Sequence, residues 1–185
     1  MQTNNWIATT GLPALAIMAL LIGAAACEGA HKQDAAVSPN EINFLQAVRR
    51  ENDGDLDLAR LAVRNSKNAE IRAYAQKVLA DQEIAERGLD ALASAKNVQL
   101  PLGAGDEDAA EEAKLKALSG DAFDRDFIKQ MIKNHKKTVS NFAKESKHAE
   151  DSDVKQYASK TLPLLKEHLA NAETIRDQLG GRPKG

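Results

Sequence analysis

The sequence has one cysteine, few aromatic residues and almost no net charge. A single cysteine among 185 residues excludes an intramolecular disulfide. Aromatic residues make up 4 % and hydrophobic residues 43 %, mostly Ala, Leu, Val and Ile, a balance that favours packed amphipathic helices over a β-sandwich. Because 25 Lys and Arg face 27 Asp and Glu, the formal net charge of −2 argues against nucleic acid as a partner. Length and composition together predict an all-α domain with its own core and exclude a disordered chain.

Motifs that carry well-known chemistry are also absent. The chain has no Walker loop, no dinucleotide-binding glycine fingerprint beginning on a strand, no HExxH zinc motif, no cysteine pair and no G-x-S-x-G elbow. We therefore expect a protein that holds no cofactor and is not an enzyme.

The first 26 residues are predicted to be an export signal. They carry no charged side chain, and residues 12–22 form an apolar run that has the length of a secretory h-region and is too short to span a bilayer. Small residues lead into Cys27, which resembles a bacterial lipobox with an acylated cysteine. The alternative is cleavage by ordinary signal peptidase after Ala26, leaving a soluble periplasmic protein. Glu28 implies, by the sorting rules of enterobacterial lipoproteins, the periplasmic side of the outer membrane.

Beyond a flexible tether over residues 27–38, a helical domain is predicted over residues 39–181. The segment Ser38-Pro39-Asn40-Glu41 is a capping box with proline at the first helical position, so a helix is expected from residue 39 to about residue 65. A second helix is predicted to start after Asn68 and to end at Asn97, and a third to start at Asp121. A fourth is predicted to start at Asp151 or Ser152 and to end at Gly180-Gly181.

Residues 98–120 join two halves that have similar hydrophobic patterns at an offset of 83 residues. Phe44 falls on Phe127, and Ile71 on Val154. This connection is far longer than a turn between two helices needs, is predicted to contain a short helix, and is long enough to cross a bundle from end to end. The second and third helices would then run parallel. The prediction is a ferritin-like four-helix bundle made of two helical hairpins and one long crossover.

One polar residue interrupts the apolar stripe of each predicted helix near its middle. Counted from the predicted helix starts, these positions fall within about 5 Å of one another along the bundle. Burying such a group without a partner costs on the order of 1 to 3 kcal/mol, so the four side chains are expected to bond to one another, to water or to a metal. The residues are Asp55, Gln82, His135 and His168.

Two interpretations of this polar layer remain. Asp55, His135 and His168 provide two imidazoles and one carboxylate, a facial set that can bind Zn or Fe, with Gln82 and Asp81 nearby. A di-iron site would need about four carboxylates and two Glu-x-x-His motifs, which the chain lacks. The other interpretation, which we favour, is a hydrogen-bonded layer that fixes the register of the helices.

Several segments of the predicted helices together match a known family. They are Phe44, Leu58-Ala59-Arg60-Leu61-Ala62, Ile71-Arg72-Ala73-Tyr74-Ala75, Phe123-Asp124, His135, and Leu162-Pro163 to His168-Leu169. Over residues 43–179 the chain therefore resembles the ferritin-like bacterial envelope proteins grouped as domain of unknown function 4142. The resemblance implies an acidic residue near Asp55 or Asp57, an Asp-His pair in the second helix and histidines in the third and fourth. Here Asp81 is kept, but Gln82 stands in place of the histidine.

A basic stripe is predicted along the third helix. Lys129, Lys133 and Lys137 share one face at helical spacing, which suits contact with anionic lipid head groups or cell-wall polymers. The other interpretation, which we favour, is a solvated face whose charges lie near the acidic crossover. Our leading functional hypothesis is a non-catalytic envelope protein that is anchored to the membrane through Cys27 and contacts an envelope protein or an anionic surface. The second hypothesis is a metal-dependent oxidase or metal carrier.

Overall fold

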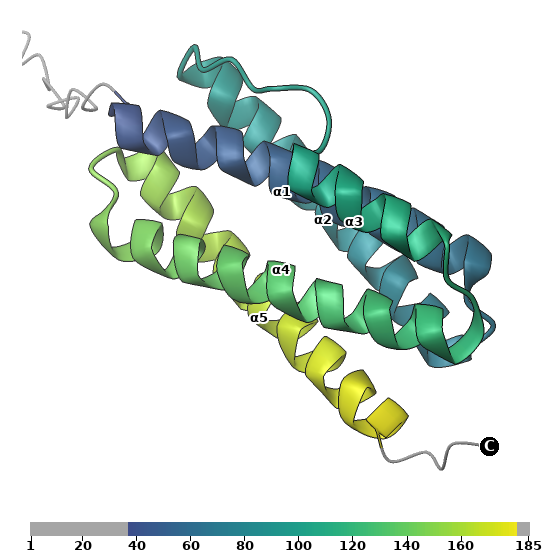
Figure 1. Cartoon of the computed structure of the whole chain (residues 1–185). Coiled ribbons are helices and arrows are strands. Elements are labelled where there is room, and N and C mark those ends of the chain that lie inside the picture. The colour runs from purple at the N-terminus through teal and green to yellow at the C-terminus, as the bar shows by residue number, and fades with distance from the viewer. Residues whose placement is uncertain (1–36, 181–185) are drawn as a thin grey trace, which may run out of the picture. The chain divides into compact units, whose positions relative to one another are not determined.

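The computed structural model describes residues 37–180, and all regular secondary structure in that range is helical (Figure 1). The predicted signal, Cys27 and most of the predicted tether lie outside the described residues, as does residue 181. No helix within residues 37–180 has the length and apolar character needed to cross a membrane. The helices are α1 (Pro39–Asn65), α2 (Ala69–Ala95), α3 (Asp106–Lys116), α4 (Gly120–His148) and α5 (Ser152–Gly180).

The helix starts follow from local capping. In the predicted capping box, the Glu41 amide donates to Ser38 Oγ at 3.3 Å and the Ser38 amide donates to the Glu41 carboxylate at 2.8 Å. Asn68 caps α2 by accepting from the Glu70 amide at 2.9 Å. The sequence also predicted α4, which begins one residue earlier than expected, at Gly120, and α5, which begins at Ser152 as expected.

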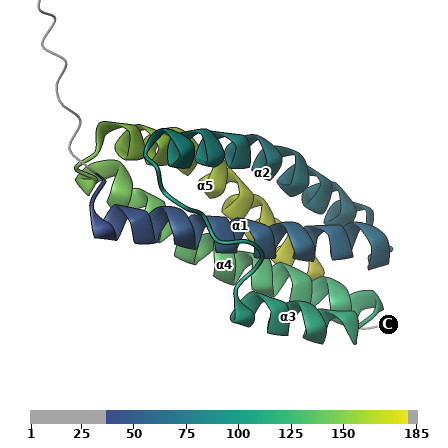
Figure 2. The same cartoon turned by 90° about the horizontal axis from the view of Figure 1, so that it is seen from above.

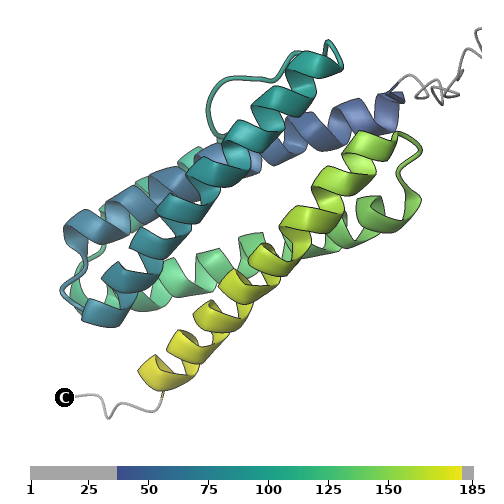
Figure 3. The ribbon, with the colours of Figure 1, turned by 180° about the vertical axis from the view of Figure 1, so that it is seen from behind.

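The four long helices form a closed ring of neighbours. Two antiparallel hairpins, α1 with α2 and α4 with α5, pack together through contacts of α1 with α4 and of α2 with α5 (Figures 1 and 3). The crossover returns along α1 from one end of this ring to the other, so α2 and α4 run in the same direction, as predicted. The short helix expected in the crossover is α3, which lies against α1 and α4 (Figure 2).

The core of the ring has two apolar parts. One cluster, which includes Leu58, Ile71 and Phe127, lies towards the α1–α2 turn, and the other, which includes Leu45, Leu89 and Phe142, lies towards the α4–α5 turn. On every long helix, the predicted polar residue stands between the residues that belong to the first cluster and those that belong to the second. The polar layer therefore separates the two halves of the core.

Candidate functional site

The polar layer is as deeply buried as the clusters on either side of it. His135 and His168 are 1 % and 0 % exposed, and Asp55 and Gln82 are also buried. The structure therefore brings all four predicted residues to one level of the bundle. Asp81, which was expected nearby, bonds to His168, and Asn134, which was not expected, bonds to Asp55.

A chain of hydrogen-bonding atoms crosses the bundle through the two histidines. Nε2 of His135 lies 3.3 Å from Nδ1 of His168, and the ring planes meet at 67°. Nδ1 of His135 lies 3.0 Å from the Met131 carbonyl oxygen, and Nε2 of His168 lies 2.8 Å from Oδ2 of Asp81. The chain thus links α4 through α5 to α2, and all four ring nitrogens face an atom of the protein.

The two ends of this chain determine how many protons it needs. The Met131 carbonyl and the Asp81 carboxylate accept hydrogen bonds and cannot donate them, so each must receive an N–H from the ring beside it. A hydrogen bond between the rings needs a third N–H, whereas two neutral imidazoles carry only two. The chain of three bonds is therefore complete only when the pair of histidines holds one extra proton. Burial lowers the pKa of His168, and the hydrogen bond with Asp81 opposes this shift.

Asp55 lies at the other side of His135. Its Oδ1 accepts a hydrogen bond from Nδ2 of Asn134 at 2.8 Å, and its Oδ2 lies 3.7 Å from Nδ1 of His135. Burial raises the pKa of Asp55, opposed by the charge of His135 and by the bond from Asn134. Sequence reasoning missed Asn134, because this residue lies beside the apolar stripe of α4 rather than on it.

Asp81 connects the layer to the surface of the bundle. Nζ of Lys77 lies 2.8 Å from Oδ2 of Asp81 and 3.3 Å from Oε1 of Glu167. Burial works to raise the pKa of Asp81, but the bonds from Lys77 and His168 outweigh it and lower the pKa. Asp81 is therefore a carboxylate at neutral pH. The hydrogen-bond partner of Nε2 of His168 is thus Asp81, and Gln82, one residue later, is buried.

The predicted metal ligands do not converge on one point. Asp55 faces Nδ1 of His135, whereas His168 faces Nε2 on the other side of the same ring. Within residues 37–180, no group of three or more His, Cys, Asp or Glu side chains is arranged to hold a metal ion. The arrangement supports the hydrogen-bonded interpretation of the layer.

The predicted basic stripe lies on an exposed face of α4 and is largely paired with acids. Nζ of Lys133 lies 2.6 Å from Oε1 of Glu107 in α3, and Nζ of Lys137 lies 3.2 Å from Oε1 of Glu51 in α1. Lys129 is also exposed. The acidic crossover thus lies against the stripe, as the solvated-face interpretation expected.

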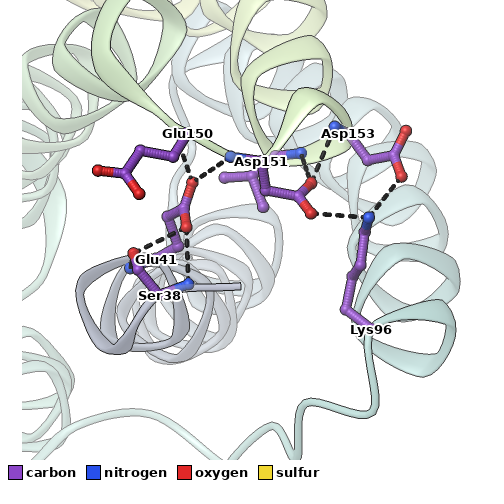
Figure 4. Close-up of polar contacts among 7 residues, drawn as sticks. Ser38, Glu41, Lys96, Glu150, Asp151 and Asp153 are labelled. Atoms are coloured by element: carbon purple, nitrogen blue, oxygen red, sulfur yellow. Dashed lines mark hydrogen bonds and ion pairs between the residues drawn. The ribbon is translucent and has the colours of Figure 1, made fainter. Parts of the chain in front are cut away.

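A polar clamp, which the sequence did not predict, ties three helix ends together (Figure 4). Oε1 of Glu41 accepts from the amides of Glu150 and Asp151 at 2.8 and 2.9 Å. Nζ of Lys96 lies 2.7 Å from Oδ2 of Asp151 and 2.7 Å from Oδ2 of Asp153. Glu41 and Asp151 are buried charges that their partners hold in place, so the clamp joins the start of α1, the end of α2 and the α4–α5 turn.

Comparison with protein families gives a clear result. The family model described as "Domain of unknown function (DUF4142)" matches residues 26–175. The chain belongs to the DUF4142 family. All the residues of the polar layer lie within the matched range of this DUF4142 protein, and so does the clamp. A comparison with curated proteins finds no match.

Solved structures show that the DUF4142 chain shares its fold with proteins of another family of unknown function. A DUF305 fragment from Deinococcus radiodurans has a TM-score of 0.69 at 21 % identity, with 77 % of this chain and 98 % of that chain covered. A putative secreted DUF305 protein from Streptomyces coelicolor has a TM-score of 0.66 at 12 % identity, with 78 % and 97 % covered. CopM in its Cu(II)-bound form has a TM-score of 0.64 at 16 % identity, with 75 % and 96 % covered.

Proposed function

We propose that this DUF4142 protein is an exported, membrane-anchored helical protein of the bacterial envelope that has no catalytic site and acts through its surface. The observation that carries the proposal is the closure of the polar layer: every ring nitrogen of His135 and His168 faces an atom of the chain itself. A catalytic histidine needs a nitrogen directed at its substrate. A layer whose histidine nitrogens face one another and the surrounding chain instead fixes how four helices align.

We further propose that the fold is a ferritin-like four-helix bundle of two hairpins joined by a crossover. The ring of long helices and the parallel course of α2 and α4 support this class. In place of the carboxylates and Glu-x-x-His motifs of a di-iron site, this chain has Ile132 and Leu165 three residues before its two histidines.

Export and anchoring rest on the sequence before residue 37. The apolar run and the small residues before Cys27 favour acylation of that cysteine, and the putative secreted protein of similar fold supports export. Two or more acyl chains, each worth about 0.8 kcal/mol per buried CH₂, hold a protein on a membrane. We place the mature protein on the periplasmic side of the outer membrane, with the soluble periplasm as the alternative.

Fractionation of cells that express the full chain tests this proposal. The wild type is expected in the membrane fraction with an acyl mass on Cys27, and Cys27→Ser is expected in the soluble fraction. A wild type that fractionates as soluble and shows no acyl mass would contradict the anchor.

A second candidate function is metal binding by the two histidines. Nε2 of His135 and Nδ1 of His168 are 3.3 Å apart, about the separation of two nitrogen ligands on a tetrahedral ion with bonds of about 2.0 to 2.1 Å. Met131 and Asp81 would hold the outer N–H groups, the usual surroundings of metal-bound histidines. The copper-bound state of CopM, which has a similar fold, supports this candidate, with Zn or Fe as further ions. It ranks second because the described residues supply only two ligands that converge.

A further inference from the structure

The N-terminal half of α3 lies against a glycine of α1. A Cβ atom at Gly54 would lie 2.7 Å from both Cβ and Cγ of Asp108, a distance that real Cβ atoms essentially never show. Glycine at position 54 therefore allows the close approach of α3, although glycine in the middle of a helix costs about 1 kcal/mol relative to alanine.

The attachment of α3 is strong at one end and weak at the other. Leu115, near its C-terminus, is completely buried in the core, and it is the one buried residue of α3. At the N-terminal end, Gly105 provides no side-chain cap, and the exposed ion pair between Glu107 and Lys133 connects α3 to α4. An isolated helix of this length is marginal in water, so the first turns depend on these contacts.

The space below these first turns is incompletely filled and is lined by charged and polar residues. A cavity of about 130 Å³ lies there. Burial, with a contribution from the charge of Asp55, raises the pKa of Asp108 to about 6, so this carboxyl is placed unfavourably when it is charged. The cavity is lined by Glu51, Glu107, Asp108, Lys133, Asn134 and Lys137.

The charge of α3 is complementary to the lysines that it covers. Glu111 and Glu112 are paired with lysines of α3 itself. The acidic residues Asp106, Glu107 and Asp108 remain at its N-terminus, beside the stripe on α4. An anionic surface would offer Lys133 the same kind of partner as Glu107 does.

We propose that α3 is a displaceable acidic cover on the basic stripe of α4, and that an anionic phospholipid surface competes with its N-terminal half for Lys133. This inference rests on the proposed surface function and adds the class of partner and its control. Anionic lipid is the partner that a membrane-anchored domain meets first. Release of the first turns would free Lys133 and remove three carboxylates from the lysines that bind the surface.

Two glycine substitutions provide a matched test. Gly54→Ala introduces the clash with Asp108, whereas Gly88→Ala, in the middle of α2, places its Cβ 3.6 Å from the ring of Tyr157, an ordinary contact. Both variants gain helix propensity. All proteins in the test are full chains with Cys27→Ser, so that no acyl chain contributes to binding. Hydrogen exchange of the α3 amides and co-sedimentation with phosphatidylglycerol vesicles are measured, with phosphatidylcholine vesicles as the uncharged reference.

We expect Gly54→Ala to accelerate exchange at the start of α3 and to raise the affinity for phosphatidylglycerol vesicles about fivefold, the gain expected from one freed lysine. Gly88→Ala should change neither. Glu107→Gln, which leaves Gly54 in place, should also raise the affinity, and adding Lys133→Met to Gly54→Ala should abolish the gain.

Four results would overturn the inference. Unchanged exchange in Gly54→Ala would show that the glycine does not control the docking of α3. Faster exchange without stronger binding, or no effect of Glu107→Gln on binding, would show that α3 does not compete with lipid. Absence of vesicle binding in every variant would remove the anionic partner but would leave export and anchoring, which fractionation tests, unaffected.

Discussion

Replacement of the two histidines by leucine, singly and together, probes whether the polar layer is a self-contained network. His135→Leu leaves the inner nitrogen of His168 without its partner, and His168→Leu does the same to His135. Each buried polar group without a partner costs about 1 to 3 kcal/mol. For a chain of this size, each kcal/mol corresponds to about 2 to 4 °C in Tm.

The double variant should lose less than the two single variants added together. With both rings gone, Asp81 keeps Lys77 and Asp55 keeps Asn134, so neither carboxylate is left alone. Replacing all the partners of a buried polar contact by apolar groups of similar size is often nearly neutral. We therefore expect a coupling energy of about 2 kcal/mol in favour of the double variant.

Urea unfolding at mildly acidic pH, where the pair of histidines takes up the extra proton that the bond between the rings needs, measures this coupling. The exposed His148→Leu is a control that should stay within about 0.5 kcal/mol of the wild type. Single variants as stable as the wild type, or a double variant that loses the full sum, would refute the network.

Two further predictions concern the clamp and the cover. Lys96→Met should destabilise the fold by about 1 to 3 kcal/mol at neutral pH, because it leaves the Asp151 carboxylate buried without its cation. Burial works to raise the pKa of Asp151, but the bonds from Lys96 and two amides outweigh it and lower the pKa. The stability that Lys96 contributes is therefore present above about pH 4 and is lost on acidification. A difference in stability between variant and wild type that does not shrink below pH 4 would contradict this role of Lys96. Burial instead raises the pKa of Asp108 to about 6, so the docking of α3 should weaken as the pH rises through 6. Asp108→Asn, which removes this charge, should slow hydrogen exchange of α3 at pH 7. Equal exchange at pH 5 and pH 7 in the wild type would argue against a role of the Asp108 charge in docking.

The helices and the level of the polar layer could be predicted because both follow from local rules. Caps such as Ser38 and Asn68 act within one turn, and a polar residue on an apolar stripe must be buried wherever the stripe is buried. Counting residues from each cap then placed Asp55, His135 and His168 at one level.

The atoms that meet within the layer could not be predicted in this way. Which nitrogen of His135 faces Asp55 depends on ring orientation, which neighbouring helices determine. The sequence pointed to Asp55 as the carboxylate of a ligand set with both histidines, whereas Asp81 is the one that contacts His168. Asn134 was missed because it lies beside the apolar stripe of α4, so that only its hydrogen bond to Asp55 of α1 makes it part of the layer.

The clamp and the docking of α3 depend even more on long-range contacts. Glu41 was identified as part of a capping box, and its second carboxylate oxygen bonds amides more than 100 residues away. The hydrophobic pattern of α1 gives no reason for a glycine at position 54. The glycine is needed because α3 lies against it. From the sequence, α3 was expected only as a short helix somewhere in the crossover, with no indication of which helix it contacts.

Our central claim is that the histidines of the polar layer contact each other and the surrounding chain rather than a metal ion. Metal analysis of the full-length protein, purified without an affinity tag, tests this claim most directly. We expect less than stoichiometric Zn, Fe and Cu. We also expect that these ions do not raise the Tm of the wild type relative to that of the His135→Leu, His168→Leu double variant. One metal ion per chain that survives purification and is lost in His135→Ala would contradict it and make metal binding the function of the layer.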